Sequence, residues 1–212
     1  MQWGRVRITG GFALLWALLL YFDAGVLIWY WAAAAFHELG HWIVLKSFGG
    51  GVARWELTLN GISMELDIAK LRYGVEVAVA LAGPFFGIIA ALVCAHCAEA
   101  LEWRNGYILA GANLSLALFN LLPAKSLDGG RALRHMICRY GAPRTADRVS
   151  TCLTLVTALL VAVGGVVLFR QSSYNITLFC IGITLLYETW GGMRANGVRR
   201  TKQSAPRYSL HV

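Results

Sequence analysis

Long apolar segments recur along this chain of 212 residues, and they limit its fold more than any other feature. Hydrophobic residues make up 58% of the chain and charged residues only 14%, whereas a soluble domain is about half apolar and about a quarter charged. A soluble fold of this size would struggle to bury so much apolar surface. We therefore predict one all-α polytopic membrane domain over residues 1–196, followed by a basic, disordered cytoplasmic tail over 197–212.

The apolar segments predict about six transmembrane helices. A hydrocarbon core of about 30 Å needs about 20 residues per helix, so the first segment is short for an independent span. Arg5 and Arg7 precede it as in a signal peptide, but no small-residue cleavage site follows, and we expect the segment to be retained. The predicted spans are residues 8–22, 25–48, 74–98, 106–122, 150–169 and 174–190.

The basic residues predict an orientation for these six spans. With a cytoplasmic N-terminus, 17 of the 19 Lys and Arg residues fall on the cytoplasmic side, and only Arg104 and Arg170 fall on the other. This asymmetry follows the positive-inside rule. We expect a multi-pass cell membrane protein with both termini in the cytoplasm. The lipid bilayer also accounts for the net charge of +8 without a nucleic-acid partner.

Residues 55–66 predict a small β-hairpin between the second and third spans. Trp55, Leu57 and Leu59 alternate with polar residues, and Asn60-Gly61 suits the positive φ angles of a type I′ turn. Two roles stay open for this hairpin: a plain connector, or an edge strand that a substrate peptide joins.

The second predicted span contains the sequence His37-Glu38-Leu39-Gly40-His41. Residues i and i+4 share one face of a helix, so His37 and His41 can bind one metal ion, and imidazole suits zinc. Glu38 can then reach a water on that ion as a general base. Three ionisable residues in one turn of a membrane helix are costly without partners, which argues against coincidence. We expect one Zn²⁺ per chain.

A catalytic zinc site needs a third protein ligand, and Asp128 is the best candidate. It follows the fourth predicted span on the cytoplasmic side, at the depth expected for His37 and His41. Gly129-Gly130 permits a close backbone approach next to it. The less favoured candidates are His96, His135, Glu188 and His211.

Three motifs give the chain a family resemblance. The HExxH motif, Ala82-Gly83-Pro84 and the stretch from Asn120 to Gly130 together resemble the site-2 protease family of intramembrane zinc metalloproteases. Within it, the stretch is similar to the subgroup of stage IV sporulation protein FB, which processes pro-sigma-K. The resemblance covers roughly residues 5–139. It implies that zinc is held by His37, His41 and Asp128, that Glu38 is the catalytic base, and that Asn120 orients the substrate.

The chain departs from the family pattern at two places. Ser126 stands where the family usually has a second Pro, and Asn60-Gly61 stands in place of the usual Phe-Gly-Gly of the hairpin region. Substrate docking is therefore less securely implied than catalysis. Since no CBS or PDZ segment is visible, we expect regulation to come from a membrane partner or from the substrate itself.

The predicted function is hydrolysis of peptide bonds in membrane-tethered protein substrates, such as a pro-sigma or anti-sigma factor. One alternative is a zinc-binding membrane protein without proteolytic activity, either an inactive homologue or a metal transporter. Transport would favour ionisable residues along several spans, whereas here they concentrate at one depth. Another HExxH membrane protease, with Glu188 as its third ligand, and a purely structural membrane scaffold are further alternatives.

Overall fold

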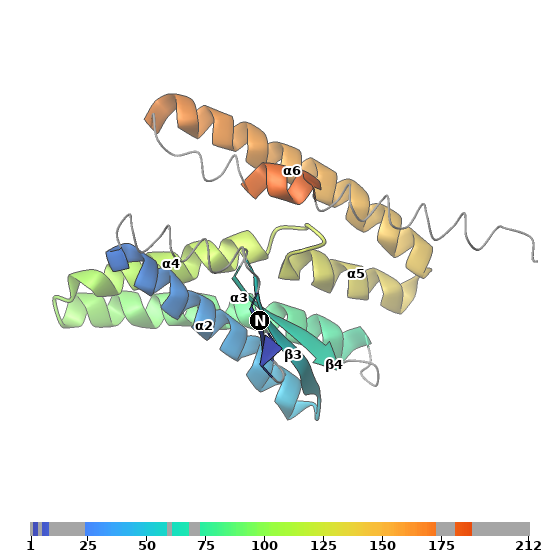
Figure 1. Ribbon diagram of the computed structural model, residues 1–212, viewed down its shortest axis with the longest axis horizontal. Helices are drawn as coiled ribbons and strands as arrows, with labels where there is room; N and C mark the ends of the chain where they lie inside the picture. The colour runs from blue at the N-terminus through green and yellow to red at the C-terminus, as the bar shows by residue number, and fades with distance from the viewer. Residues whose placement is uncertain are drawn as a thin grey trace, which may run out of the picture.

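The computed structural model describes residues 2–3, 6–8, 24–58, 61–67, 73–172 and 181–187. Helices dominate this part of the chain, and a four-stranded sheet lies beside them (Figure 1). In chain order the elements are β1 (Gln2–Trp3), β2 (Val6–Ile8), α2 (Ala24–Ser47), β3 (Gly51–Thr58), β4 (Gly61–Asp67), α3 (Tyr73–Ala100), α4 (Arg104–Asn120), α5 (Asp128–Tyr140) and α6 (Pro143–Ser172). A short helix follows at 181–187.

The helices coincide with several of the predicted spans. α2, α3, α4 and α6 overlap the second to fifth predicted spans, and the helix at 181–187 lies within the sixth. Two of the described helices, at 73–100 and 143–170, are long and apolar enough to cross a membrane. The first predicted span lies outside the described residues except for Ile8, which ends β2, so the predicted start of that span at residue 8 was wrong. The six-span count, the orientation and the 197–212 tail stay predictions.

The sheet has the strand order β1-β2-β3-β4. β3 and β4 are antiparallel, with Thr58 opposite Gly61 and Leu57 opposite Ile62. This register leaves residues 59 and 60 between the two strands, one position before the predicted Asn60-Gly61 turn. Residues 59 and 60 themselves lie outside the described part of the chain. β2 pairs with β3 in parallel. That pairing joins segments about fifty residues apart, which no local sequence pattern indicates.

Small residues let α2 and α3 pack closely. A Cβ atom on Gly40 of α2 would lie 2.8 Å from Phe86 Cβ and 2.9 Å from Ala82 O, both on α3. Gly87 faces Ala117 of α4 in the same way. Such contacts are typical of helices packed in membranes. They bring the turn of α2 that carries the HExxH motif directly onto α3.

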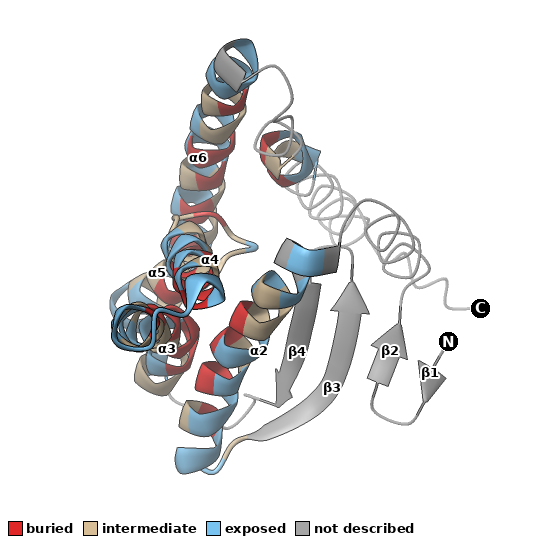
Figure 2. Cartoon of the chain, turned by 90° about the vertical axis from the view of Figure 1, so that its left-hand side faces the viewer, coloured by how far each residue is buried: buried red, intermediate tan, exposed pale blue. Residues whose placement is uncertain are grey.

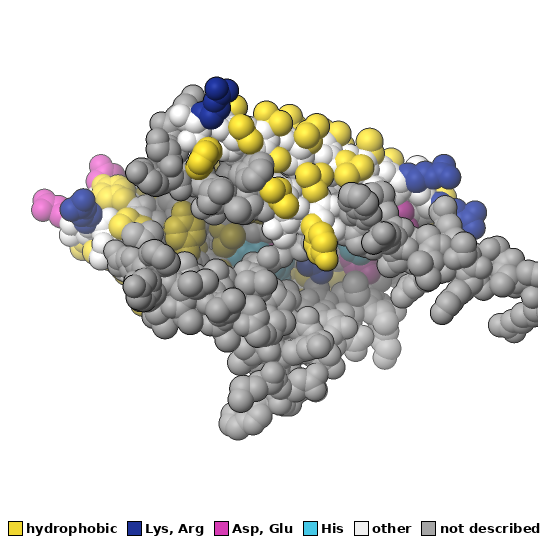
Figure 3. Space-filling model, turned by 45° about the horizontal axis from the view of Figure 1, so that its top comes forward, with side chains coloured by type: hydrophobic (Ala, Val, Ile, Leu, Met, Phe, Trp, Pro, Cys, Tyr) yellow, Lys and Arg dark blue, Asp and Glu magenta, His cyan; other side chains and the backbone are white. Residues whose placement is uncertain are grey.

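α6 meets the rest of the bundle through the 121–127 loop and α5 (Figure 1). Arg134 Nε of α5 donates a 2.9 Å hydrogen bond to Asp147 Oδ1 of α6. Ala124 in the loop packs with Ala158 of α6 and Leu185 of the last helix. An exposed apolar band runs along α6 between basic side chains at its ends (Figure 3), as in a helix that faces lipid.

Candidate metal centre

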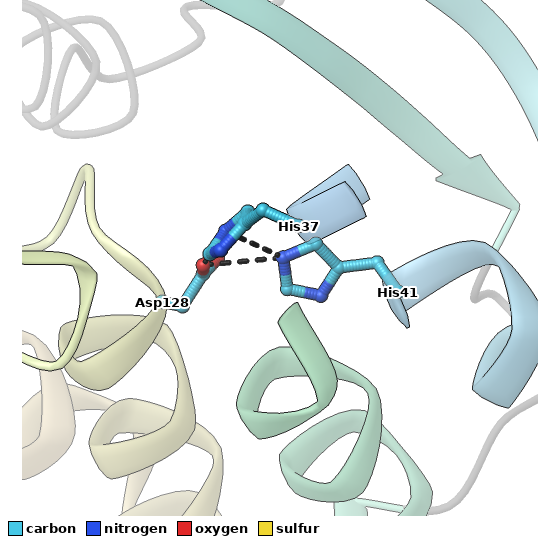
Figure 4. Close-up of side chains that lie close together, drawn as sticks. All are labelled: His37, His41 and Asp128. Atoms are coloured by element: carbon cyan, nitrogen blue, oxygen red, sulfur yellow. Dashed lines mark hydrogen bonds and ion pairs between the residues drawn. The ribbon is translucent and has the colours of Figure 1, made fainter. Parts of the chain in front are cut away.

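The fold brings His37, His41 and Asp128 together in one buried cluster (Figure 4). Asp128 Oδ2 lies 2.8 Å from His37 Nε2 and 3.1 Å from His41 Nε2, and the two Nε2 atoms are 3.2 Å apart. His37 is only 4% exposed, His41 6% and Asp128 5%. Polar groups buried this deeply need partners, and here the two Nε2 atoms and Oδ2 supply one another, while His37 Nδ1 is buried without a hydrogen-bond partner among the described residues.

The sequence around Asp128 explains how its carboxylate reaches α2. Asp128 is the first residue of α5, and the preceding Leu127 is extended. A Cβ atom on Gly129 would overlap Leu121 O, and one on Gly130 would overlap Ala124 O. The two glycines therefore let the 121–127 loop pack against the first turn of α5. This close contact sets the position of Asp128 at the start of the helix.

The geometry of the cluster fits zinc. Ligand atoms at about 2.0–2.1 Å from a tetrahedral zinc ion are separated by about 3.3 Å. The three separations here are 2.8, 3.1 and 3.2 Å, so the ligands need to move apart by only a few tenths of an ångström. Two imidazoles and one carboxylate are also a donor set that zinc accepts.

Backbone atoms of α3 complete the surroundings of the cluster. His41 Nδ1 donates a 2.7 Å hydrogen bond to Val79 O, which leaves Nε2 of the neutral ring with a lone pair for a metal. A Cβ atom on Gly83 would overlap His41 Nε2 and lie 2.8 Å from His37 Nε2. The partners of this close contact at Gly83 are thus the two imidazoles themselves.

The two remaining predicted residues differ in their placement. Glu38 is partly buried next to His37 on α2, and its carboxyl group interacts electrostatically with both histidines, Asp128 and Arg131. Asn120 is the last residue of α4, and its Nδ2 donates a 3.0 Å hydrogen bond to Leu116 O. Among the contacts of the described residues, none joins Asn120 to the cluster.

The other candidate ligands do not join the cluster in the described part of the chain. His96 is exposed on α3, while Glu188 and His211 lie outside the described residues. His135 is on α5, where its Nδ1 lies 2.6 Å from Glu76 Oε2 of α3. Burial lowers the pKa of His135, and Arg134 and Arg131 add to this effect against the opposing carboxylate of Glu76. This pair joins α5 to α3 and was not predicted.

A cation also stands beside the cluster. Arg131 Nη1 lies 3.7 Å from Asp128 Oδ1, the carboxylate oxygen that the histidines leave free. Its side chain is 45% exposed, so it partly compensates the Asp128 charge from the solvent side. The i, i+3 spacing of an acid and a base at the start of a helix is the sequence signal that could have identified this pair.

The fold is that of a site-2 protease. The solved structure named Site-2 Protease from Methanocaldococcus jannaschii matches with a TM-score of 0.66 at 22% identity, over 100% of this chain and 96% of that one. Residues 102–164, which include Asp128, match the family model described as peptidase family M50.

Two curated relatives point the same way. The zinc metalloprotease MJ0392 of Methanocaldococcus jannaschii is 28% identical over 185 residues, or 82% of this chain. A protein provisionally named zinc metalloprotease Rip3, from Mycobacterium tuberculosis, is 30% identical over 151 residues, or 66% of this chain. This chain spans 49% and 38% of the lengths of these relatives. Together the comparisons support the site-2 protease family within peptidase family M50; the sporulation subgroup is not confirmed.

Proposed function

We propose that this chain is an intramembrane zinc metalloendopeptidase. The observation that carries the proposal is the buried cluster of His37, His41 and Asp128, with Glu38 next to His37 on the same helix. Three protein ligands leave one coordination position free, as a catalytic rather than a structural zinc site requires. The names of the curated relatives agree with this activity.

The chemistry follows from the roles of the side chains. A zinc ion held by the cluster supplies Lewis acidity that activates water and polarises a peptide carbonyl. Glu38 accepts the proton of the attacking water and then donates it to the leaving amine. Val79 O holds the imidazole of His41 in the orientation that ligation needs. Asn120 Nδ2 carries two N–H groups, and one of them bonds Leu116 O. We assign the other as a second hydrogen-bond donor to the developing oxyanion.

The proposed substrates are membrane-tethered proteins with a scissile bond in or near a transmembrane helix. A substrate helix satisfies its own backbone hydrogen bonds, so it must unwind before hydrolysis. β4 offers a place for the unwound segment because, among the described strands, it pairs only with β3. It also lies beside α2, which carries the cluster (Figure 2). The extended substrate would join this edge by backbone hydrogen bonds.

The location of the site follows the predicted topology. We propose a multi-pass cell membrane protein with the cluster toward the cytoplasm, consistent with the apolar helices at 73–100 and 143–170. A membrane-tethered transcription regulator, such as a pro-sigma or anti-sigma factor, is the substrate class that we favour. A membrane partner that controls access to the site is part of the same proposal.

Co-expression with a panel of single-span reporter proteins, each tagged on its cytoplasmic side, tests this function. The wild-type chain should release a shortened tagged fragment from at least one reporter, and His37→Ala should release none. If the wild-type chain binds zinc but cleaves no reporter, the second candidate function, zinc binding without proteolysis, is favoured. Glu38 stands against that candidate, because binding alone needs no base beside the ligands.

A further inference from the structure

The loop that leads to Asp128 is held by the hydroxyl groups of α6. The backbone N–H of Lys125 donates a 3.0 Å hydrogen bond to Thr154 Oγ1, and Lys125 Nζ donates a 2.6 Å hydrogen bond to Thr151 Oγ1. Each hydroxyl also donates to its own helix, Thr154 to Ser150 O and Thr151 to Asp147 O. Both hydroxyls are therefore fixed in direction, with their lone pairs facing the loop.

Thr154 is buried where a hydroxyl group is expensive. Its residue is 1% exposed, in the part of α6 that is apolar enough to cross a membrane. The Thr154 hydroxyl supplies the acceptor that the partly buried backbone N–H of Lys125 needs. Ala124, the neighbour of Lys125, packs on Ala158 one turn further along α6. The loop is thus anchored on α6 by both a polar and an apolar contact.

The anchored loop is rigidly joined to Asp128. Leu127 N–H donates a 2.9 Å hydrogen bond to Ala124 O, and Arg131 N–H donates a 3.0 Å hydrogen bond to Leu127 O. Ala124 O is also the atom against which Gly130 packs without room for a Cβ. A shift of the loop away from α6 would therefore move the first turn of α5, and with it the Asp128 carboxylate.

We propose that Thr154, assisted by Thr151, is a positioning residue that holds Asp128 at the distance required for metal binding. Metal ligands depend on such outer contacts, whose loss typically weakens metal affinity about 10–100-fold. α6 contributes no residue to the cluster, so its part in metal binding is indirect: it fixes the loop from which the third ligand projects. The proposal rests on the proposed zinc site.

Three variants of the full chain, purified in detergent, test this positioning role. Their Zn²⁺ affinity is measured by competition with a chelator. The geometry of the site is followed through the absorption spectrum of bound Co²⁺. Thr154→Val keeps the shape but removes the acceptor, and it should weaken Zn²⁺ binding about tenfold and change the Co²⁺ bands. Thr154→Ser keeps the acceptor and should bind as the wild type does. Thr157→Val is the matched control, because Thr157 is also buried on α6 but has no described hydrogen bond to the 121–127 loop.

The outcomes separate this role from general packing. Equal loss of affinity in Thr154→Val and Thr157→Val, or no loss in Thr154→Val, would overturn the positioning role and leave the zinc site intact. Absence of metal binding in the wild-type chain would overturn both the proposed function and this role. If Thr154→Val does not fold, Thr151→Val replaces it in the test, because Thr151 is only partly buried. Unchanged Zn²⁺ affinity in Thr151→Val would then overturn the assistance of Thr151 and the proposal with it.

Discussion

Gly83 of α3 lies so close to His41 of α2 that a Cβ atom at this position would overlap the imidazole Nε2 atom. The same atom would lie 2.8 Å from His37 Nε2, so any side chain here would occupy the space between the two ligand nitrogens. The absence of a side chain at Gly83 is therefore a requirement of the proposed metal site, and not only of helix packing.

Gly83→Ala should abolish zinc binding while the chain still inserts into the membrane. The methyl group would push the imidazoles apart or fill the position of the ion, so we expect zinc content to fall at least about tenfold. Gly111→Ala is the control, since a Cβ atom there meets nothing within 4 Å. It should keep full zinc content and stabilise α4 by up to about 1 kcal/mol. Metal analysis of both purified variants distinguishes the two positions.

Much of the site was predictable because its spacing is local. The i, i+4 pair of His37 and His41 needs only a helix, and α2 provides it. Asp128 could be proposed from depth and from the neighbouring glycines, since the order of spans places distant segments at one level. The role of the Val79 carbonyl as the partner of His41 could not be predicted. Every residue has a backbone carbonyl, and no side-chain pattern shows which one accepts such a bond.

The sheet shows where local patterns fail. The alternation in 55–66 indicated strands in the region of β3 and β4, but the Val6–Ile8 strand is too short to show alternation. Its pairing with residues 55–57 depends on tertiary contacts alone. For the same reason the loop register was predicted one residue too late: Asn60-Gly61 favours a turn, but the cross-strand pairs decide where it forms.

Gly130→Ala should displace Asp128 without touching the cluster. A Cβ atom at Gly130 would overlap Ala124 O, so the first turn of α5 must move away from the loop. We expect about tenfold weaker zinc binding and a lower thermal midpoint in detergent. Gly141→Ala, at the other end of α5, is the control: its backbone is extended, and its Cβ would lie 3.3 Å from Ile137 O, a close contact that a shift of a few tenths of an ångström relieves. Equal zinc affinity in the two variants would contradict this account of the glycine pair.

Stability should depend on pH through His135. Its pKa in the folded chain lies below the ordinary value of 6.5, so below this pH the unfolded chain binds the proton more readily than the folded chain does. The folded state therefore loses stability as the pH falls through this range. The thermal midpoint of the wild type should drop more between pH 7.5 and 5.5 than that of His135→Gln, measured without added metal. All other ionisable side chains are present in both proteins, so their contributions largely cancel in the comparison. Identical drops would show that His135 is not the responsible group.

Cysteine labelling should reveal the orientation of the chain. In a background without the native cysteines, Arg104→Cys and Arg170→Cys should react with an impermeant maleimide in intact cells, and Lys202→Cys should react only after lysis. This pattern follows from the positive-inside distribution of basic residues. The reverse pattern would place the metal centre toward the outer face of the membrane and exclude a cytoplasmic site of cleavage.

Glu38→Gln separates metal binding from hydrolysis. The substitution preserves the size of the side chain and removes its capacity to accept a proton, while the three proposed ligand atoms belong to His37, His41 and Asp128. Zinc content and membrane insertion should therefore equal those of the wild type. Cleavage of a reporter that the wild type cuts should fall by at least about 10²-fold, the lower end of the range for lost general-base catalysis. The variant should also retain uncleaved reporter, which co-purification would detect. Near-normal cleavage by Glu38→Gln would refute the proposed mechanism even with zinc bound, whereas loss of zinc would assign Glu38 to the metal site itself.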